Sequence, residues 1–289
     1  MKSTCIVTDG SVQFSKPTAS GSALVKIMPL EITLGGQVYS DGNGYKPSSL
    51  PQYADKGLSP FVKAPSPEQF YNLFSSLGQT YDNILGIFTS NQLIPCYENA
   101  LKASHNLQGR SKIILIDSLT ISAGLGFLVQ MAVDGIQKGQ PLLEIERQIR
   151  SIIPSIYSII CPAGLSYLYY NGYIDQGQAI VNELLGLFPI FAFENGNLAP
   201  LEKVKNSRNV IGFFQEFLDE FEHLQHIAFI QSALPNFQES KILRDNFQRE
   251  SPTPYSEHII NLPLSALFGP RTLGMIIVES QSIKKNKHI

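Results

Sequence analysis

The sequence is poor in charged residues and has little excess of either sign. Only 16% of its 289 residues are charged, against about 25% in an average soluble protein. It has 22 Lys and Arg residues and 24 Asp and Glu residues. Such a balance argues against a nucleic-acid partner, because a phosphate backbone is recognised by a basic field. We interpret the basic end of the chain, residues 281–289, as a solvated tail.

Cysteines are few, and long apolar runs are absent. Cys5, Cys96 and Cys161 are far apart and odd in number, so they predict neither a disulfide framework nor a metal cluster. A reducing cytoplasm is the expected location. The apolar run after Lys2 ends at Val7, which is too short for a secretory signal, and no stretch approaches the ~20 residues of a membrane span. We therefore expect a soluble globular protein.

The first half of the chain alternates short apolar strands with helices. Strands are predicted at 5–7, 29–34, 37–39, 83–89 and 112–116, and helices at 66–77, 95–107 and 121–138. Gly35 and Gly36 favour a tight hairpin with positive φ, and Ser66 begins a capping box. Gly124 and Gly126 indicate that the apolar helix at 121–138 packs close to its neighbours. This alternation predicts a parallel, doubly wound sheet.

Beyond Pro154 the pattern changes to hairpins and isolated strands. A helix opens at Pro141, strands are predicted at 188–193, 198–204, 226–230, 257–262 and 274–279, and helices at 209–224 and 236–247. We predict two α/β domains, residues 1–153 with the parallel sheet and residues 154–280 with a mixed sheet. His223 and His226 are expected to cap the helix at 209–224, because no third ligand nearby completes a metal site.

Three apolar strands of the first half end in small polar residues. These ends are Thr8–Ser11, Thr89–Asn91 and Asp117–Ser118. In an open parallel sheet such ends lie along one carboxyl edge, where ligands bind, and the following helices point unpaired N–H groups toward it. An oxyanion suits this edge, although the same residues also serve as helix caps. No Gly-rich phosphate loop follows the first strand, which disfavours a nucleotide enzyme.

Several motifs occur in an order that is typical of one family. They are Ile6–Asp9, the hairpin from Pro29 to Gly42, Pro65–Phe70, Ser90–Ala100, Ile116–Gly126 and Phe268–Gly274. Together they resemble the DegV family of bacterial fatty-acid-binding proteins, which has an EDD-type fold, from about residue 3 to residue 279. The hairpin is the most specific match. We therefore identify the chain by resemblance as a divergent DegV-family member.

The resemblance implies a fold and a function. One long-chain fatty acid is expected in a tunnel between two α/β domains, lined from apolar runs such as Leu184–Phe193, with its carboxylate at the polar edge. The protein would be a non-catalytic carrier that needs no metal or cofactor besides the acid. The family presents its bound acid to a fatty-acid kinase, which phosphorylates the carboxylate.

The resemblance also assigns residues to the carboxylate end of the ligand. Ser90 retains the family's head-group hydroxyl, while Val62 stands where a threonine is usual and Leu267 where a histidine is usual. Presentation to the kinase is therefore expected to be poor. We call the following set the predicted head-group residues, in which Lys63 and Arg271 are the cations available as substitutes: Val62, Lys63, Thr89, Ser90, Asn91, Ser118, Leu267 and Arg271.

Two other functions remain open on the same scaffold. One is an enzyme of phosphoryl transfer or hydrolysis that uses Asp9, Ser11, Asp117 or Ser118. The other is a degenerate family member with a regulatory or scaffolding role. A carrier predicts an enclosed apolar tunnel and no metal, whereas an enzyme predicts a hydrated cleft with a perturbed acid or base.

Overall fold

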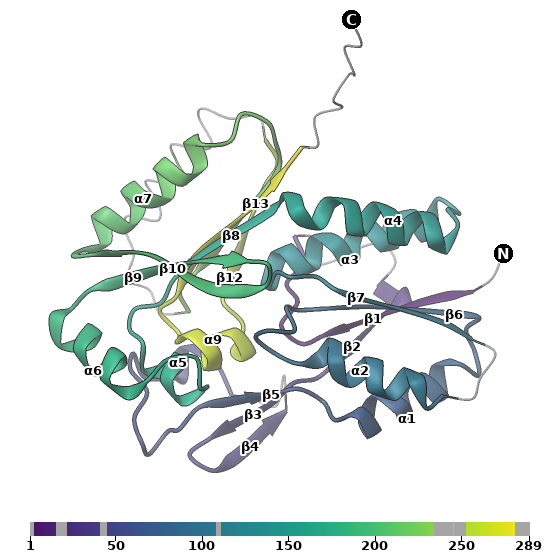
Figure 1. Cartoon of the computed structure of the whole chain (residues 1–289), viewed down its shortest axis with the longest axis horizontal. Helices are drawn as coiled ribbons and strands as arrows, with labels where there is room; N and C mark the ends of the chain where they lie inside the picture. The colour runs from purple at the N-terminus through teal and green to yellow at the C-terminus, as the bar shows by residue number, and fades with distance from the viewer. Residues whose placement is uncertain are drawn as a thin grey trace, which may run out of the picture.

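The computed structural model describes residues 3–15, 22–40, 45–107, 111–233, 245 and 253–280. Its N-terminal part is built on a four-stranded parallel sheet in the order β2-β1-β6-β7 (Figure 1). Every residue of β1 and β6 is buried, as expected for a parallel sheet that is covered on both faces. The strands are β1 (Thr4–Asp9), β2 (Val25–Met28), β6 (Asn83–Phe88) and β7 (Lys112–Asp117).

Helices cover both faces of this sheet, which confirms the predicted doubly wound arrangement. On one face, Val7 and Ile84 share a core with Phe70 and Phe74 of α1 (Pro67–Leu77) and with α2 (Cys96–His105). On the other face, alternate strand residues pack against α3 (Ser122–Gln137) and α4 (Leu142–Ile152). The period of two along each strand therefore divides its side chains between two cores.

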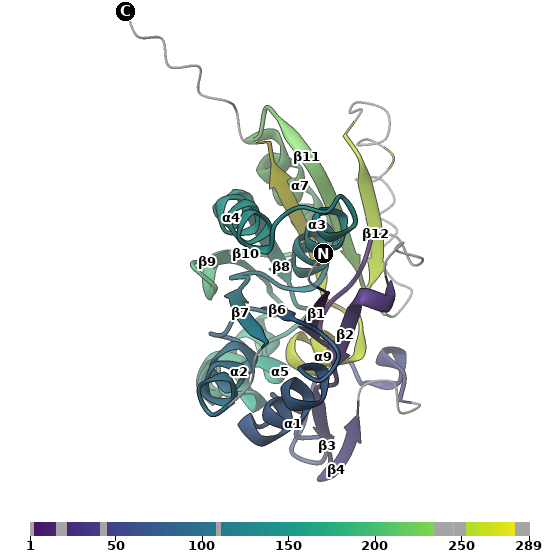
Figure 2. The ribbon, with the colours of Figure 1, turned by 90° about the vertical axis from the view of Figure 1, so that its right-hand side faces the viewer.

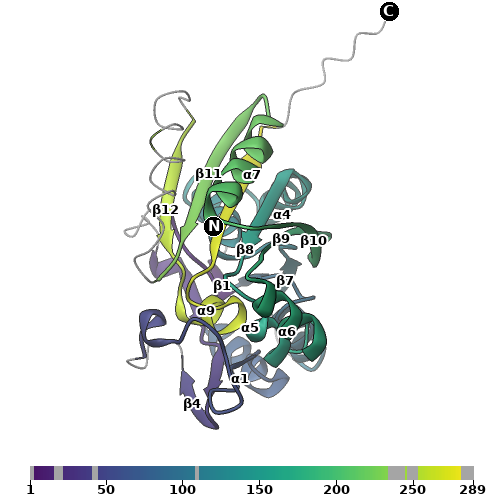
Figure 3. The ribbon, with the colours of Figure 1, turned by 90° about the vertical axis from the view of Figure 1, so that its left-hand side faces the viewer.

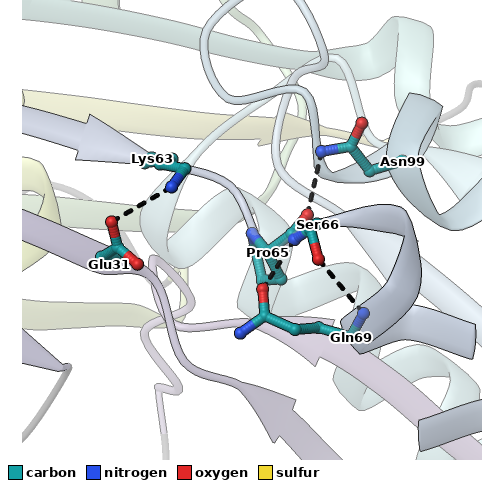
Figure 4. Close-up of polar contacts among 6 residues, drawn as sticks. All are labelled: Glu31, Lys63, Pro65, Ser66, Gln69 and Asn99. Carbon is teal, nitrogen blue, oxygen red and sulfur yellow. Dashed lines mark hydrogen bonds and ion pairs between the residues drawn. The ribbon is translucent and has the colours of Figure 1, made fainter. Parts of the chain in front are cut away.

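Two local predictions in this part are confirmed. Ser66 caps α1: its side chain accepts from Gln69 N at 3.2 Å, and Gln69 Oε1 accepts from Ser66 N at 2.7 Å (Figure 4). The hairpin of β3 (Glu31–Leu34) and β4 (Gln37–Ser40) turns at Gly35 and Gly36, whose φ angles are 55° and 78°. Both features depend on neighbouring residues alone.

The hairpin belongs to a separate small sheet that the sequence did not reveal. Its order is β4-β3-β5, with β5 (Phe61–Lys63) antiparallel to β3. β5 lies in a stretch rich in Pro, Ser and Gly, and three residues are too few to display an alternating pattern. Two 3₁₀ turns also occur in the N-terminal part: η1 (Ser22–Leu24) directly before β2, and η2 (Pro47–Ser49) between β4 and β5.

The C-terminal part is built on a six-stranded sheet in the order β10-β9-β8-β13-β11-β12. β11 and β12 pair in parallel, and the other neighbours pair antiparallel, which confirms the predicted mixed sheet. α7 (Ser207–Asp219) packs on one face through Val210 and Phe214. The strands are β8 (Ile156–Cys161), β9 (Phe188–Glu194), β10 (Asn197–Val204), β11 (Leu224–Gln231), β12 (Tyr255–Ile259) and β13 (Leu273–Glu279).

Some predictions in this part are wrong. α7 ends at Asp219 and β11 begins at Leu224, so His226 lies on a strand and caps no helix. The strand predicted at 257–262 ends at Ile259, because Asn261 caps α9 (Leu262–Phe268), its side chain accepting from Leu264 N at 3.2 Å. The helix predicted at 236–247 lies outside the described residues. The domain boundary near residue 154 stays a prediction; η3 (Ile153–Ser155) lies there.

The segment after β1 joins the two parts. Asn261 Nδ2 donates to Gly10 O at 3.2 Å and to Ser11 O at 3.1 Å, and Gln13 Nε2 donates to Ile259 O at 2.7 Å. The segment after β1 consequently runs along β12, where Ser256 Oγ donates to Ser15 Oγ at 3.2 Å (Figure 2). Among the described residues, no helix combines the length and the apolar character that crossing a membrane requires.

Candidate functional site

The polar strand ends converge at one edge of the parallel sheet, as predicted. Asp9 is fully buried and accepts three hydrogen bonds, from Ser11 N at 3.0 Å, Ser11 Oγ at 2.6 Å and Thr89 N at 2.7 Å. Burial raises the pKa of the Asp9 carboxyl, against the opposing effect of these donors. Asp9 therefore ties the end of β1 to the end of β6.

Asp117 joins the loop after β6 to the loop after β7. Its Oδ1 accepts from Asn91 N at 3.2 Å and from Leu119 N at 3.1 Å, and burial raises its pKa. The hydroxyls nearby also bond to the protein: Ser118 Oγ donates to Thr120 O at 3.2 Å, and Thr89 Oγ1 donates to the same carbonyl at 3.1 Å. These hydroxyl and amide donors are thus committed to internal acceptors, whereas the buried Thr8 Oγ1 has no hydrogen-bond partner among the described residues.

Ser90 connects the polar edge to the C-terminal sheet. Its side chain is fully buried, and its Oγ donates to Gly196 O at 2.6 Å in the turn between β9 and β10. Gly196 has a φ of +82°, and a Cβ there would lie 2.6 Å from Ser90 Oγ. A glycine is therefore required for the hairpin to approach this hydroxyl.

The other predicted head-group residues lie in several surroundings. Val62 on β5 and Leu267 on α9 are buried, and the two elements pack together. Lys63 Nζ points to Glu31 on the neighbouring strand, at 3.3 Å in an exposed pair (Figure 4), and Arg271 Nη1 donates to Gln52 Oε1 at 2.5 Å. Contact of the whole set with a ligand stays a prediction.

A cavity of about 760 Å³ lies next to this edge and is lined by residues of α6 (Gln176–Leu185) and of the β9–β10 hairpin. Figure 3 shows the ribbons of α6, β9 and β10 on the same side of the molecule. The volume lies within the roughly 300–1000 Å³ of small-molecule sites. The apolar run predicted to line a tunnel contributes Leu185, Leu187, Pro189, Ile190 and Phe191. The other lining residues are Gln92, Leu93, Leu165, Tyr173, Ile174, Gly177, Gln178, Val181, Asn182, Asn197, Leu198, Pro200, Glu202 and Lys203.

The cavity has an inner end at the polar edge and extends along β10. At the inner end, Gln92 and Leu93 follow the edge residue Asn91 directly, and the Tyr173 hydroxyl donates to Leu93 O. From Asn197 to Lys203 the strand covers roughly 20 Å at ~3.3 Å per residue. The predicted head-group residues are not among those that line the cavity, and the contact with the N-terminal part is made by Gln92 and Leu93.

The sequence reading missed the helix that forms one wall of this cavity. α6 follows α5 (Ser166–Tyr170) and is capped by Asp175, whose side chain accepts from Gln178 N at 2.9 Å. An Asp followed three residues later by Gln is a readable N-terminal helix signal. In the described part of the chain, no group of three or more His, Cys, Asp or Glu side chains is arranged to hold a metal ion.

Comparison with known proteins places this arrangement in a family. The DegV family, described as an uncharacterised protein family, matches residues 3–280. The chain belongs to the DegV family. A DegV domain-containing protein of Caldanaerobacter subterraneus subsp. tengcongensis is 28% identical over 196 residues, which cover 66% of this chain and 68% of that protein.

Solved structures of DegV proteins share the fold. A DegV-family protein from Thermus thermophilus, described by its fatty acid binding, superimposes with a TM-score of 0.81 at 22% identity, covering 97% of this chain and all of that one. The fatty acid kinase B3 protein of Streptococcus pneumoniae, loaded with linoleic acid, gives 0.79 at 18% identity and covers 96% of this chain and all of its own. The family and two-domain α/β fold expected from the motifs are confirmed.

Proposed function

We propose that this DegV-family protein is a non-catalytic carrier of a long-chain acyl lipid of the fatty-acid class. The observation that carries the proposal is the cavity between α6 and the β9–β10 hairpin, which is mostly apolar, roughly 20 Å long by strand geometry, and ends at the polar edge. The fatty-acid ligands named for its structural neighbours in Thermus and Streptococcus support the same class of ligand.

Burial of an acyl chain supplies enough free energy for such binding. Each buried methylene contributes ~0.8 kcal/mol, so ~14 methylenes give about 11 kcal/mol before the costs of association. Those costs are on the order of 4–15 kcal/mol. The apolar walls therefore contribute most of the binding free energy, and the polar end determines which acyl ligands bind best.

The carboxyl groups of the polar edge support binding over catalysis. An acid or base catalyst must reach the substrate, but Asp9 is fully buried and accepts three protein donors, and neither Asp9 nor Asp117 lines the cavity. Both carboxylates hold the strand ends and the following loops in place. The three free, buried cysteines are compatible with the proposed location in a reducing cytoplasm.

A fatty-acid kinase is the proposed class of protein partner, on the precedent of the Streptococcus kinase component. Val62 provides no hydroxyl and Leu267 no imidazole to hold a carboxylate for phosphoryl transfer. We therefore expect little acyl phosphate when the wild-type protein and palmitate are mixed with such a kinase. Abundant product would contradict this expectation.

The proposal is tested by filling the cavity from β10. Leu198 lines the cavity, whereas Leu201 on the same strand lines a separate groove. Leu198→Trp is expected to abolish uptake of radiolabelled acyl ligands, and the matched Leu201→Trp to retain it. Circular dichroism and thermal melting verify that both variants are folded. Equal uptake by wild type and both variants would place the acyl site elsewhere and contradict the proposal.

A further inference from the structure

Several hydrogen-bond donors at the inner end of the cavity are already used by the protein. Ser90 Oγ donates to Gly196 O, and the Tyr173 hydroxyl donates to Leu93 O. The backbone amides of Leu93 and Ile94 both donate to Ser90 O, at 3.0 and 3.1 Å. Among the described lining residues, a carboxylate at this end would therefore find neutral amide donors such as Gln92 and no cation to balance its charge.

The polar edge behind this end is rich in acceptors. Asp9 takes the donors of Ser11 and Thr89, and Asp117 takes the backbone amides of Asn91 and Leu119. These are the loop amides that would otherwise face an anion at a sheet edge. The carboxyl groups of Asp9 and Asp117 thus already accept from these loop amides, and a ligand carboxylate beside them would be disfavoured by like charge.

The two cations among the predicted head-group residues do not line this end of the cavity. Lys63 is paired with Glu31 on the exposed small sheet, and Arg271 with Gln52, and neither lines the cavity. Of the described residues that do line it, Lys203 is the one cation, and Glu202 precedes it. Lys203 lies roughly 20 Å along β10 from Asn197, at the opposite end of the cavity.

We propose that the cavity selects acyl ligands whose polar end is uncharged, such as a fatty alcohol, an ester or a protonated acid, over ionised fatty acids. The inference rests on the acyl-binding function proposed above and specifies its ligand class. Gln92 and Asn197, whose side-chain amides both donate and accept, are neutral polar side chains that line this end of the cavity. An ionised acid would enter only after it takes up a proton.

Competition binding tests this selection. Hexadecanol, methyl palmitate and palmitate each displace a pyrene-labelled fatty alcohol from the full-length protein between pH 6 and 8. Hexadecanol and methyl palmitate are expected to bind equally well at each pH. Palmitate is expected to weaken about tenfold per pH unit, because a carboxyl group with a pKa near 4.3 loses nine-tenths of its neutral form with each unit.

Each other outcome has a defined meaning. Palmitate that matches or exceeds hexadecanol at pH 8 overturns the neutral-ligand inference and leaves the acyl carrier intact. If that tight palmitate binding is lost in Lys203→Met while hexadecanol still binds, the carboxylate pairs with Lys203 and the inference is also overturned. If the probe does not bind, or if it binds and none of the three acyl ligands displaces it, the carrier function fails and the inference with it.

Discussion

A glycine in α3 provides a quantitative test of how the two parts of the chain fit together. A Cβ added at Gly126 would lie 1.9 Å from Gln13 O, a backbone atom that cannot rotate away. Gln13 also joins α3 to β12, because its N donates to Ser122 O at 3.2 Å and its Nε2 to Ile259 O at 2.7 Å. Gly126→Ala must therefore displace the segment that links both parts.

The expected cost follows from opposing contributions. Overpacking of a close contact costs typically 1–3 kcal/mol, and disturbing the Gln13 hydrogen bonds adds about 1 kcal/mol each. Alanine regains about 1 kcal/mol through its higher helix propensity. We expect Gly126→Ala to lose about 2–4 kcal/mol, which lowers the melting temperature by roughly 3–7 °C at an unfolding entropy of about 2.1 cal/mol/K per residue.

Gly212 in α7 is the matched control for this substitution. It is exposed, and a Cβ there meets no atom within 4 Å. Gly212→Ala is expected to gain about 0.5–1 kcal/mol from helix propensity and reduced unfolded-chain entropy. Thermal melting of both variants provides the comparison. A Gly126→Ala protein as stable as wild type would refute the close packing of α3 on the Gln13 segment.

Two further predictions concern His258 and Ser90. The imidazoles of His226 and His258 each lie 2.9 Å from Ser256 Oγ, and burial, followed by the charge of His226, lowers the pKa of His258 to about 4. The unfolded chain therefore binds more protons than the folded protein between about pH 4 and 6.5, so the free energy of unfolding falls as the pH falls through that window. Denaturant unfolding at several pH values should show that this free energy depends less on pH in His258→Asn than in the wild type. An equal dependence on pH in both proteins would refute this. Ser90→Ala leaves Gly196 O unpaired and should cost about 1–3 kcal/mol, whereas an unchanged melting temperature would show that the bond contributes nothing.

The sequence predicts those features that depend on neighbouring residues. The Gly35–Gly36 turn and the Ser66 capping box are confirmed because their residue types and spacing determine the local backbone. α9 is not predicted from the sequence, because all of its residues are buried, which leaves no helical period to detect. The strand predicted at 257–262 overlaps α9 at Leu262 alone.

Contacts between residues that are far apart in the sequence cannot be predicted from local patterns. The family resemblance predicts that Ser90 contacts the ligand, and the sequence holds no sign that its hydroxyl reaches Gly196, 106 residues away. Likewise, His226 meets His258 and Ser256 through the parallel pairing of β11 with β12. The apolar run at 184–193 did predict part of the cavity wall, because burial against a ligand and burial in a core require the same residue types.

The central claim is that the cavity between α6 and the β9–β10 hairpin holds an acyl lipid. Native mass spectrometry of the protein purified from bacterial cells, followed by organic extraction, measures this directly. The account predicts a near-stoichiometric acyl lipid in the wild type and in Leu201→Trp, and its loss in folded Leu198→Trp. A wild-type protein that carries no lipid and takes up neither added hexadecanol nor added palmitate or oleate would contradict the claim.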